Sequence, residues 1–307
     1  MLKCKKMHNS NLAYIQLGRK IMGSIIQLMR PKQWSKNFFV FAAIIFSGNF
    51  LHQSVLRNNI LTFILFCITS STIYILNDIV DVEKDKCHPD KKNRPIASGR
   101  ISKNKAITLD ILLFILVICL TYIFLNTKIL LVFLVYIIVN IFYSFKLKNL
   151  VIIDVMTIAF GFVLRVESGS IATGVQVSPW LFLCTILLAL FLGLNKRKSE
   201  IVALKDKSSS SRKILEEYSI KNIDKMLTIV NPSVLMAYCL YTFSSTQSRT
   251  MMFTIPFVLY GILRYEYLMD KENIGGKPED VFQKDIPFFI DILIWIIVVI
   301  VIIYFKL

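Results

Sequence analysis

Apolar residues along this chain gather in nine long runs, which are separated by segments rich in Lys, Arg, Ser and Pro. A helix needs about 20 mostly apolar residues to cross the hydrocarbon core of a bilayer. The pattern therefore predicts nine transmembrane helices, of which the first is short and has polar flanks. The runs lie near residues 36–52, 59–80, 107–126, 129–147, 150–172, 179–195, 228–247, 251–269 and 286–305.

The composition supports a membrane protein. Of the 307 residues, 55% are hydrophobic and 18% are charged, and a water-soluble core of that size would leave too little polar surface to cover it. These values exclude a free cytosolic enzyme and a secreted disulfide-rich module. The six cysteines are scattered and form no C-x-x-C pair, so neither a metal site nor a disulfide framework is expected. The N-terminus lacks the apolar segment of a cleaved signal peptide.

Basic residues are concentrated in alternate connections between the predicted helices. If the N-terminus is cytoplasmic, the cytoplasmic segments hold 31 of the 36 Lys and Arg residues and the opposite side holds four. The positive-inside rule then predicts a cytoplasmic N-terminus and an external C-terminus. This distribution accounts for the net charge of +16 without a nucleic-acid partner. We expect a multi-pass protein of the inner or plasma membrane.

The chain is expected to have two parts. Residues 12–30 place apolar positions at roughly helical spacing with Arg and Lys between them, which indicates a helix lying in the membrane interface. We therefore expect residues 1–30 to form an N-terminal cytoplasmic or interfacial segment and residues 31–307 to form the transmembrane domain. Two long cytoplasmic connections, 82–105 and 195–225, have room for more than a turn.

The second predicted helix ends in YILNDIVDVEKD, which collects oxygen-bearing side chains on one face. At about 100° per residue, Tyr74, Asn77, Asp78, Asp81 and Asp85 fall within one sector of about 100°. Neighbouring carboxylates repel one another unless a cation holds them. Oxygen ligands without His or Cys favour Mg²⁺ or Mn²⁺, and protein-bound Mg²⁺ usually also binds substrate phosphates. The alternative is a solvated helix end whose carboxylates pair with nearby lysines.

Four basic clusters lie on the same predicted side of the membrane as these carboxylates. They are Arg30, Lys32 and Lys36 around Trp34; Lys91, Lys92, Arg94 and Arg100; Lys146 and Lys148; and Lys196, Arg197 and Lys198 with Glu200. Because Lys and Arg bind phosphate oxygens, the combination is typical of a pocket for more than one phosphate group. Taken singly, Lys92 and Arg100 are better explained by the positive-inside rule.

Arg165 lies deep within the fifth predicted helix. It follows Asp154 by eleven residues, which places both on one face and about 16 Å apart along the axis. A charge at that depth is costly and by default marks a functional site, and an ion pair with a neighbouring helix is the alternative. Gly161 lies on the same face, where we expect the missing side chain to leave room for a lipid. Glu167 points away from this face.

The pattern N-D-x-x-D-x-x-x-D, formed by Asn77, Asp78, Asp81 and Asp85 in a nine-helix protein, resembles the UbiA prenyltransferase superfamily. Seven further blocks, between about residues 25 and 305, resemble its decaprenyl-phosphate phosphoribosyltransferase branch. They are RPKQWSKN at 30–37, HPDKKNRPIASGRIS at 88–102, YSFKLKN at 143–149, GFVLR at 161–165, SPWLFLCT at 178–185, NKRKSE at 195–200 and EDVFQKD at 279–285.

The resemblance implies an all-α transmembrane bundle with its active site on the cytoplasmic side. The implied reaction is the transfer of a 5-phosphoribosyl group from phosphoribosyl diphosphate to a polyprenyl phosphate, with release of diphosphate. It would depend on Mg²⁺, with Mn²⁺ as the other candidate, and would supply a precursor for cell-envelope glycans. Whether the protein forms a homo-oligomer is left open.

The resemblance also implies roles for single residues. Asp78, Asp81 and Asp85 are expected to be catalytic, and Asn77 and Asp81 are expected to hold the metal. Phosphoribosyl diphosphate is expected to bind Lys32, Tyr74, Lys91, Arg94, Lys146 and Arg165. The polyprenyl phosphate is expected to bind Lys146, Arg165 and Lys196.

The chain departs from the superfamily pattern after the sixth helix. A second aspartate-rich motif is replaced here by Lys196-Arg197-Lys198-x-Glu200. The basic replacement fits a phosphate-bearing lipid acceptor. It argues against the first rival, a prenyltransferase that moves a prenyl group from prenyl diphosphate to an aromatic or isoprenoid acceptor. The second rival is a cation transporter, which would place its carboxylates near the middle of the membrane.

Overall fold

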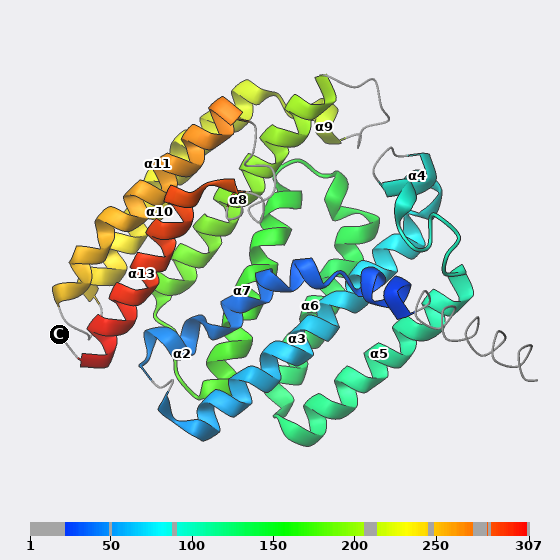
Figure 1. Ribbon diagram of the computed structural model, residues 1–307, viewed down its shortest axis with the longest axis horizontal. Helices are drawn as coiled ribbons and strands as arrows, with labels where there is room; N and C mark the ends of the chain where they lie inside the picture. Colours follow the sequence, from blue (N-terminus) through cyan, green and yellow to red (C-terminus); the bar gives the residue numbers. More distant parts are fainter. Residues whose placement is uncertain are drawn as a thin grey trace, which may run out of the picture. The chain divides into compact units, whose positions relative to one another are not determined.

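The computed structural model describes residues 22–48, 51–87, 91–205, 214–244, 249–272, 281 and 284–305. Within these ranges the regular elements are helices, and no strand occurs (Figure 1). Residues 22–29 are helical, so the described part of the predicted interfacial helix has the expected secondary structure. The remainder of that helix lies outside the described residues, and the domain boundary after residue 30 stays a prediction.

Helical elements overlap each of the predicted runs. The longer helices are α3 (Gln53–Val80), α5 (Lys103–Phe124), α6 (Thr127–Phe145), α7 (Ile153–Thr173), α8 (Pro179–Lys205), α10 (Ile220–Ser244), α11 (Ile255–Glu272) and α13 (Ile286–Phe305). The shorter elements are η1 (Pro31–Phe41), α2 (Ala42–Phe46), α4 (Val82–Cys87), η3 (Lys91–Asn93), η4 (Leu147–Asn149), α9 (Ile214–Glu217) and η5 (Arg249–Thr254). Several helices extend beyond their apolar runs, because backbone hydrogen bonding and not hydropathy decides where a helix ends.

Seven of the described helices are long and apolar enough to span a membrane: α3, α5, α6, α7, α8, α10 and α13. This finding confirms the prediction of an all-α, multi-pass membrane protein, whereas the count of nine spans stays a prediction. The first predicted run begins within the 3-10 helix η1, and the regular helix α2 that follows has only five residues. Helix α11 contains five charged residues among its 18, which lowers its hydropathy.

The chain divides into two compact units. Unit 1 comprises residues 1–37 and 64–126, and unit 2 comprises residues 38–63 and 127–307. In unit 1, Leu28 from the first helical segment belongs to the same buried cluster as Ile75 and Ile79 of α3 and Ile101 near the start of α5. This core holds the chain around residue 30 next to the acidic end of α3.

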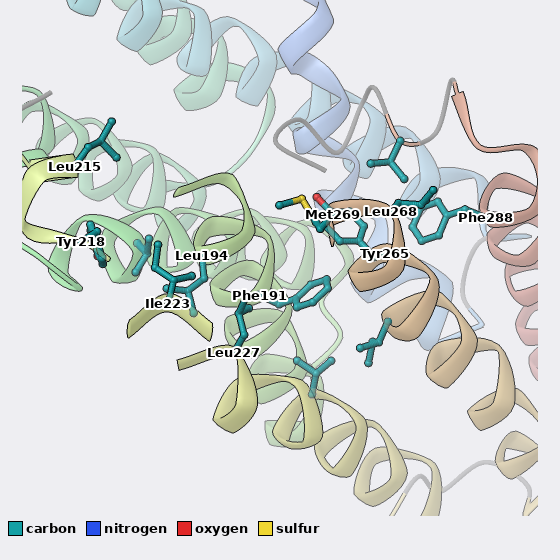
Figure 2. Packing of buried hydrophobic residues seen from close by; sticks show 14 residues of the cluster. Phe191, Leu194, Leu215, Tyr218, Ile223, Leu227, Tyr265, Leu268, Met269 and Phe288 are labelled. Atoms are coloured by element: carbon teal, nitrogen blue, oxygen red, sulfur yellow. The ribbon is translucent and has the colours of Figure 1, made fainter. Parts of the chain in front are cut away.

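Unit 2 is organised around α8, which packs against α7 and α10, while α6 packs against α7 and α13 packs against α11. Its main buried cluster includes Phe191 of α8, Ile223 and Leu227 of α10, Tyr265 of α11, and Tyr218 between α9 and α10 (Figure 2). The rings of Phe191 and Tyr265 are tilted, with their centroids 5.1 Å apart. The cluster fixes the second half of α8, which carries Arg197, and it fixes Tyr218, which carries a buried hydroxyl.

Helix α7 and η1 approach each other closely at Gly169. A Cβ atom built on Gly169 would lie 1.9 Å from the carbonyl oxygen of Val40. Small residues allow helix backbones to approach in membrane proteins, where packing contributes much of the attraction between helices. Gly169 is therefore required for this contact within unit 2.

We expect Gly169→Ala to lower the free energy of unfolding by about 1–3 kcal/mol or to prevent folding, because the new methyl group overlaps backbone atoms. Gly23→Ala is the matched control, since nothing lies within 4 Å of a Cβ atom there and Ala favours a helix over Gly. Thermal unfolding of both variants in detergent measures the difference. Equal unfolding temperatures would contradict the close approach at Gly169.

Candidate functional site: an arginine-bridged acidic helix end and a buried basic network

The acidic segment of unit 1 stays helical beyond the end of α3. The amide of Asp81 donates to the carbonyl oxygen of Asn77, and the amide of Asp85 donates to that of Asp81, both at 2.9 Å. Asn77, Asp81 and Asp85 therefore follow one another at successive helical turns. This backbone pattern carries the oxygen-bearing face from α3 into α4.

Two arginines neutralise the buried carboxylates of this segment. Asp78 is 2% exposed and Asp85 is 3% exposed. Nη1 of Arg94 donates to Oδ1 of Asp78 at 3.0 Å and to Oδ2 of Asp85 at 2.6 Å. Nη2 of Arg30 donates to the same oxygen of Asp78. A charge removed from water needs such a partner, and one guanidinium nitrogen of Arg94 bridges two carboxylates.

Arg30 lies against the predicted site, although the sequence interpretation favoured Lys32 as the phosphate ligand. Its guanidinium carbon lies 5.0 Å from the centre of the Tyr74 ring, so it contacts two predicted site residues at once. Its backbone is left-handed, with φ of 53°, which is uncommon for a residue other than glycine. Lys32 is exposed. The signal that could have identified Arg30 is the presence of several acids on one face, because each buried acid needs a cation.

The other predicted residues of unit 1 are more accessible. The Asp81 side chain is 24% exposed, with Nζ of Lys84 at 4.0 Å, and Asn77 is half-buried. Lys91 is half-buried at the start of η3, and its carbonyl oxygen accepts the amide of Arg94 at 2.9 Å. The structure thus brings Tyr74, Asp78, Asp85 and Arg94 into one network with Arg30. It leaves Asn77 and Asp81 less enclosed.

The oxygen-bearing side chains of this acidic face suit a divalent cation. Among the described residues, no group of three or more His, Cys, Asp or Glu side chains is arranged to hold a metal ion. Mg²⁺ seldom uses an all-protein cage and is usually held by one or two carboxylates together with water and phosphate oxygens. Asn77 and Asp81 supply two suitable oxygen ligands, while Asp78 and Asp85 already bind arginine.

Arg165 is buried within unit 2, where it is 5% exposed. Its Nη1 donates to the carbonyl oxygen of Gly161 at 2.7 Å, and its Nη2 donates to the hydroxyl of Tyr136 at 3.0 Å. The guanidinium carbon also lies 5.0 Å from the ring centre of Tyr136 and 5.2 Å from that of Phe162. Uncharged oxygens and aromatic rings thus fix the orientation of this cation.

The prediction that Gly161 leaves room for a lipid is wrong. A Cβ atom at Gly161 would lie 3.4 Å from Nη1 of Arg165 and 3.6 Å from the ring of Tyr136. Arg165 lies one helical turn after Gly161 and folds back to bond its carbonyl oxygen. The absent side chain therefore makes room for Arg165 itself.

A second buried network surrounds Arg197 on α8. Its Nε donates to Oδ2 of Asp154 at 2.7 Å, its Nη1 to Oε2 of Glu200 at 2.5 Å and its Nη2 to the hydroxyl of Tyr143 at 3.4 Å. The hydroxyl of Tyr218 donates to the other oxygen of Asp154 at 2.8 Å. Arg197 is 1% exposed and Asp154 is 0% exposed. Arg197 is thus bound by protein groups and is closed to a substrate phosphate.

Lys198, the next residue, also pairs with acids of the protein, since its Nζ lies 2.9 Å from Asp224 and 2.8 Å from Asp270. The prediction that this whole basic segment serves a phosphate pocket therefore does not hold for Arg197 and Lys198. The predicted phosphate ligands of unit 2 besides Arg165 are Lys196, which is half-buried on α8, and Lys146, which is exposed after α6.

The model of the UbiA prenyltransferase family matches residues 37–293. The decaprenyl-phosphate phosphoribosyltransferase of Corynebacterium glutamicum is 31% identical over 93% of this chain and 88% of its own length. The protein of the same name from Mycolicibacterium smegmatis is 31% identical over 94% of this chain and 95% of its own length.

Solved structures share the fold. A UbiA homolog from Archaeoglobus fulgidus bound to DMAPP and Mg²⁺ superposes with a TM-score of 0.72 and 18% sequence identity. The match covers 91% of this chain and 99% of that one. The helical arrangement is therefore common to both proteins, although few of their residues are the same.

Arg30→Gln should lower the free energy of unfolding by about 1–3 kcal/mol, because buried Asp78 loses a charge-assisted hydrogen bond. Lys32→Gln is the control, since Lys32 is exposed two residues later and its loss should change stability by less than about 0.5 kcal/mol. Unfolding of the purified variants in mixed micelles measures both values. If the two variants lose the same stability, Arg30 does not neutralise Asp78.

Proposed function

Since this chain belongs to the UbiA prenyltransferase family and is a transferase, we propose that it moves a 5-phosphoribosyl group from phosphoribosyl diphosphate to a polyprenyl phosphate. The observation that carries the proposal is the 31% identity to two relatives named decaprenyl-phosphate phosphoribosyltransferase, over 93% and 94% of the chain. Similarity of that extent guides the choice of substrate better than the fold does, because one fold serves many reactions.

We assign the donor to the acidic end of α3. Asn77 and Asp81 would hold Mg²⁺, or Mn²⁺, against the diphosphate of the donor. When bound, such an ion neutralises charge that develops on the leaving diphosphate. Arg94 uses Nη1 for Asp78 and Asp85 and is 27% exposed, so its other N–H groups can donate to a phosphate oxygen.

Three further residues of unit 1 complete the proposed donor site. Lys32 and Lys91 would bind phosphate oxygens of the donor, because an ammonium group is a compact donor to such anions. Tyr74 would contact the ribose or the diphosphate, with its ring held by Arg30 at 5.0 Å. Asp78 and Asp85 would act by holding the two arginines and by setting the charge around Asp81.

We assign the acceptor phosphate to Lys146, Arg165 and Lys196 of unit 2. An oxygen of the polyprenyl phosphate forms a bond to ribose C1 while the bond from C1 to diphosphate breaks. The nucleophile is already an anion, so the reaction needs no general base. Because C1 develops oxocarbenium character, stabilising the departing negative charge is the main catalytic task.

The proposed setting is the inner or plasma membrane. The distribution of 31 against four basic residues supports a cytoplasmic N-terminus and an external C-terminus. Phosphoribosyl diphosphate is a charged, water-soluble donor and would reach the site from the cytoplasm. The polyprenyl-phosphoribose formed there would be a lipid-linked sugar donor for cell-envelope glycans.

The proposal is tested with membranes that contain the overproduced protein, labelled phosphoribosyl diphosphate and a polyprenyl phosphate. Labelled lipid should form only when both substrates and Mg²⁺ or Mn²⁺ are present. A parallel reaction with labelled prenyl diphosphate and an aromatic or isoprenoid acceptor tests the rival reaction. Product from the prenyl donor, with none from phosphoribosyl diphosphate, would overturn the proposal.

Asp81→Asn should leave the fold intact and reduce turnover well beyond tenfold, because the variant loses the anionic ligand of the proposed metal ion. Glu83→Gln is the matched control, since Glu83 is exposed on the adjoining helix and pairs with Lys86 at 2.8 Å. Rates are measured at saturating Mg²⁺. A loss below about tenfold, which is about 1.4 kcal/mol, is too small for a principal metal ligand.

Arg165→Ala should weaken use of the lipid acceptor more than binding of phosphoribosyl diphosphate, because its buried charge is suited to a phosphate where water competes poorly. Tyr136→Phe is the control, since it removes the hydroxyl that accepts from Arg165 but keeps the ring and the charge. Thermal stability is measured together with the apparent affinity for each substrate. If the Arg165→Ala protein unfolds at a lower temperature, the role of Arg165 is structural. If the variant loses donor binding alone, Arg165 binds the donor and not the acceptor.

A further inference from the structure

Arg197 contacts both ends of the connection between α6 and α7. Tyr143, near the end of α6, lies 3.4 Å from Nη2 of Arg197, and Asp154, in the first turn of α7, lies 2.7 Å from its Nε. Lys146 lies on the connection between these two residues. A single buried cation of unit 2 therefore fixes the chain before and after Lys146.

The same connection contains a strained turn. Ile152 has φ of 69° and ψ of −45°, and the amide of Ile153 donates to the carbonyl oxygen of Val151 at 2.8 Å. This is a γ-turn of the rare type with positive φ, and it is especially unusual for a β-branched residue. The amide of Ile152 donates to the hydroxyl of Tyr218 at 2.7 Å. Strain of this kind persists where surrounding contacts over-determine the backbone.

Tyr218 links the strained turn to the ion pair. Burial, followed by the bond to Asp154, raises the pKa of the Tyr218 phenol, although the amide of Ile152 acts in the opposite direction. The phenol therefore stays protonated near neutral pH, so it can accept from Ile152 while it donates to Asp154. Ile152, Tyr218, Asp154 and Arg197 form one continuous chain of hydrogen bonds.

We propose that Arg197, Asp154 and Tyr218 form a positioning network that holds Lys146 where it binds the phosphate of the lipid acceptor. Arg197 is 1% exposed and Asp154 is 0% exposed, so both act through the connection that they fix and not by touching the substrate. Stability alone does not explain the arrangement, since hydrophobic groups can replace a buried ion pair without loss. The inference rests on the proposed function for the identity of the acceptor.

The test is a double-mutant cycle between Tyr218→Phe and Lys146→Gln. Tyr218→Phe keeps the ring in the core and removes both hydrogen bonds of the hydroxyl. It should raise the KM for polyprenyl phosphate roughly fivefold, within the range seen for residues that share one hydrogen-bond network. In the Lys146→Gln background the same change should have almost no effect, because the residue that the network positions is already lost.

Tyr238→Phe is the matched control. Tyr238 is another buried phenol of unit 2, and its hydroxyl bonds Thr254 at 2.7 Å and Trp295 at 2.9 Å, with no part in the Arg197 network. It should leave the acceptor KM unchanged. Thermal stability of every variant is recorded, so that a loss of folding is distinguished from a loss of affinity.

Two outcomes overturn the positioning role. One is a Tyr218→Phe protein with a lower unfolding temperature and an unchanged acceptor KM, and the other is an additive effect of Tyr218→Phe and Lys146→Gln. If the wild-type protein transfers no phosphoribosyl group, the proposed function fails by itself. The same cycle is then measured by equilibrium binding of polyprenyl phosphate to the protein in detergent. Coupling in that measurement supports the network, and additivity or absence of binding overturns it.

Discussion

Asp78, Asp85 and Asp154 are withdrawn almost completely from water, and arginine side chains neutralise all three. A carboxylate near the end of a membrane helix pays a desolvation cost of several kcal/mol unless a cation lies against it. Arginine meets this requirement better than lysine, because its planar fork can bond two acids at once. Arg94 joins Asp78 to Asp85 in unit 1, and Arg197 joins Asp154 to Glu200 in unit 2.

Pairing with arginine distinguishes the acidic groups of unit 1 from one another. Within the N-D-x-x-D-x-x-x-D segment, the carboxylates that bind arginine are held in a fixed geometry. Asn77 and Asp81 lie one helical turn apart on the same helical path and are less enclosed. A divalent cation that needs one or two protein oxygens and several phosphate oxygens suits such an arrangement. Under the proposed function, Asn77 and Asp81 would hold the ion while the arginines keep Asp78 and Asp85 in place.

Both networks include backbone that residues other than glycine rarely adopt. Arg30 has φ of 53° where its side chain meets Asp78, and Ile152 has φ of 69° where its amide meets Tyr218. Such conformations cost about 1–3 kcal/mol each and persist where several contacts hold them. In each case the strained residue lies beside a buried carboxylate. The ion pair of that carboxylate can therefore stabilise the strained backbone conformation. Charge pairing can therefore offset the local strain at both residues.

The sequence by itself determined the helices and the residues that share a helical face. Hydropathy and the 3.6-residue period are local properties, so the spacing of Asn77, Asp81 and Asp85 predicted their successive turns before any contact was known. It also indicated that Arg165 is exceptional, because a cation within an apolar run needs an explanation wherever it points.

Only the tertiary structure decided which charge meets which. Arg30 is 48 residues from Asp78 in the sequence, and Arg197 is 43 residues from Asp154. No local pattern separates Arg30 from Lys32, or Arg197 from Lys196, as the partner of a distant acid. The prediction of room for a lipid at Gly161 was wrong for a related reason. The space beside a glycine can be filled by another side chain of the protein, and here Arg165 fills it. Helical periodicity determines which residues share one face of a single helix, whereas the pairing of buried charges depends on how separate elements pack.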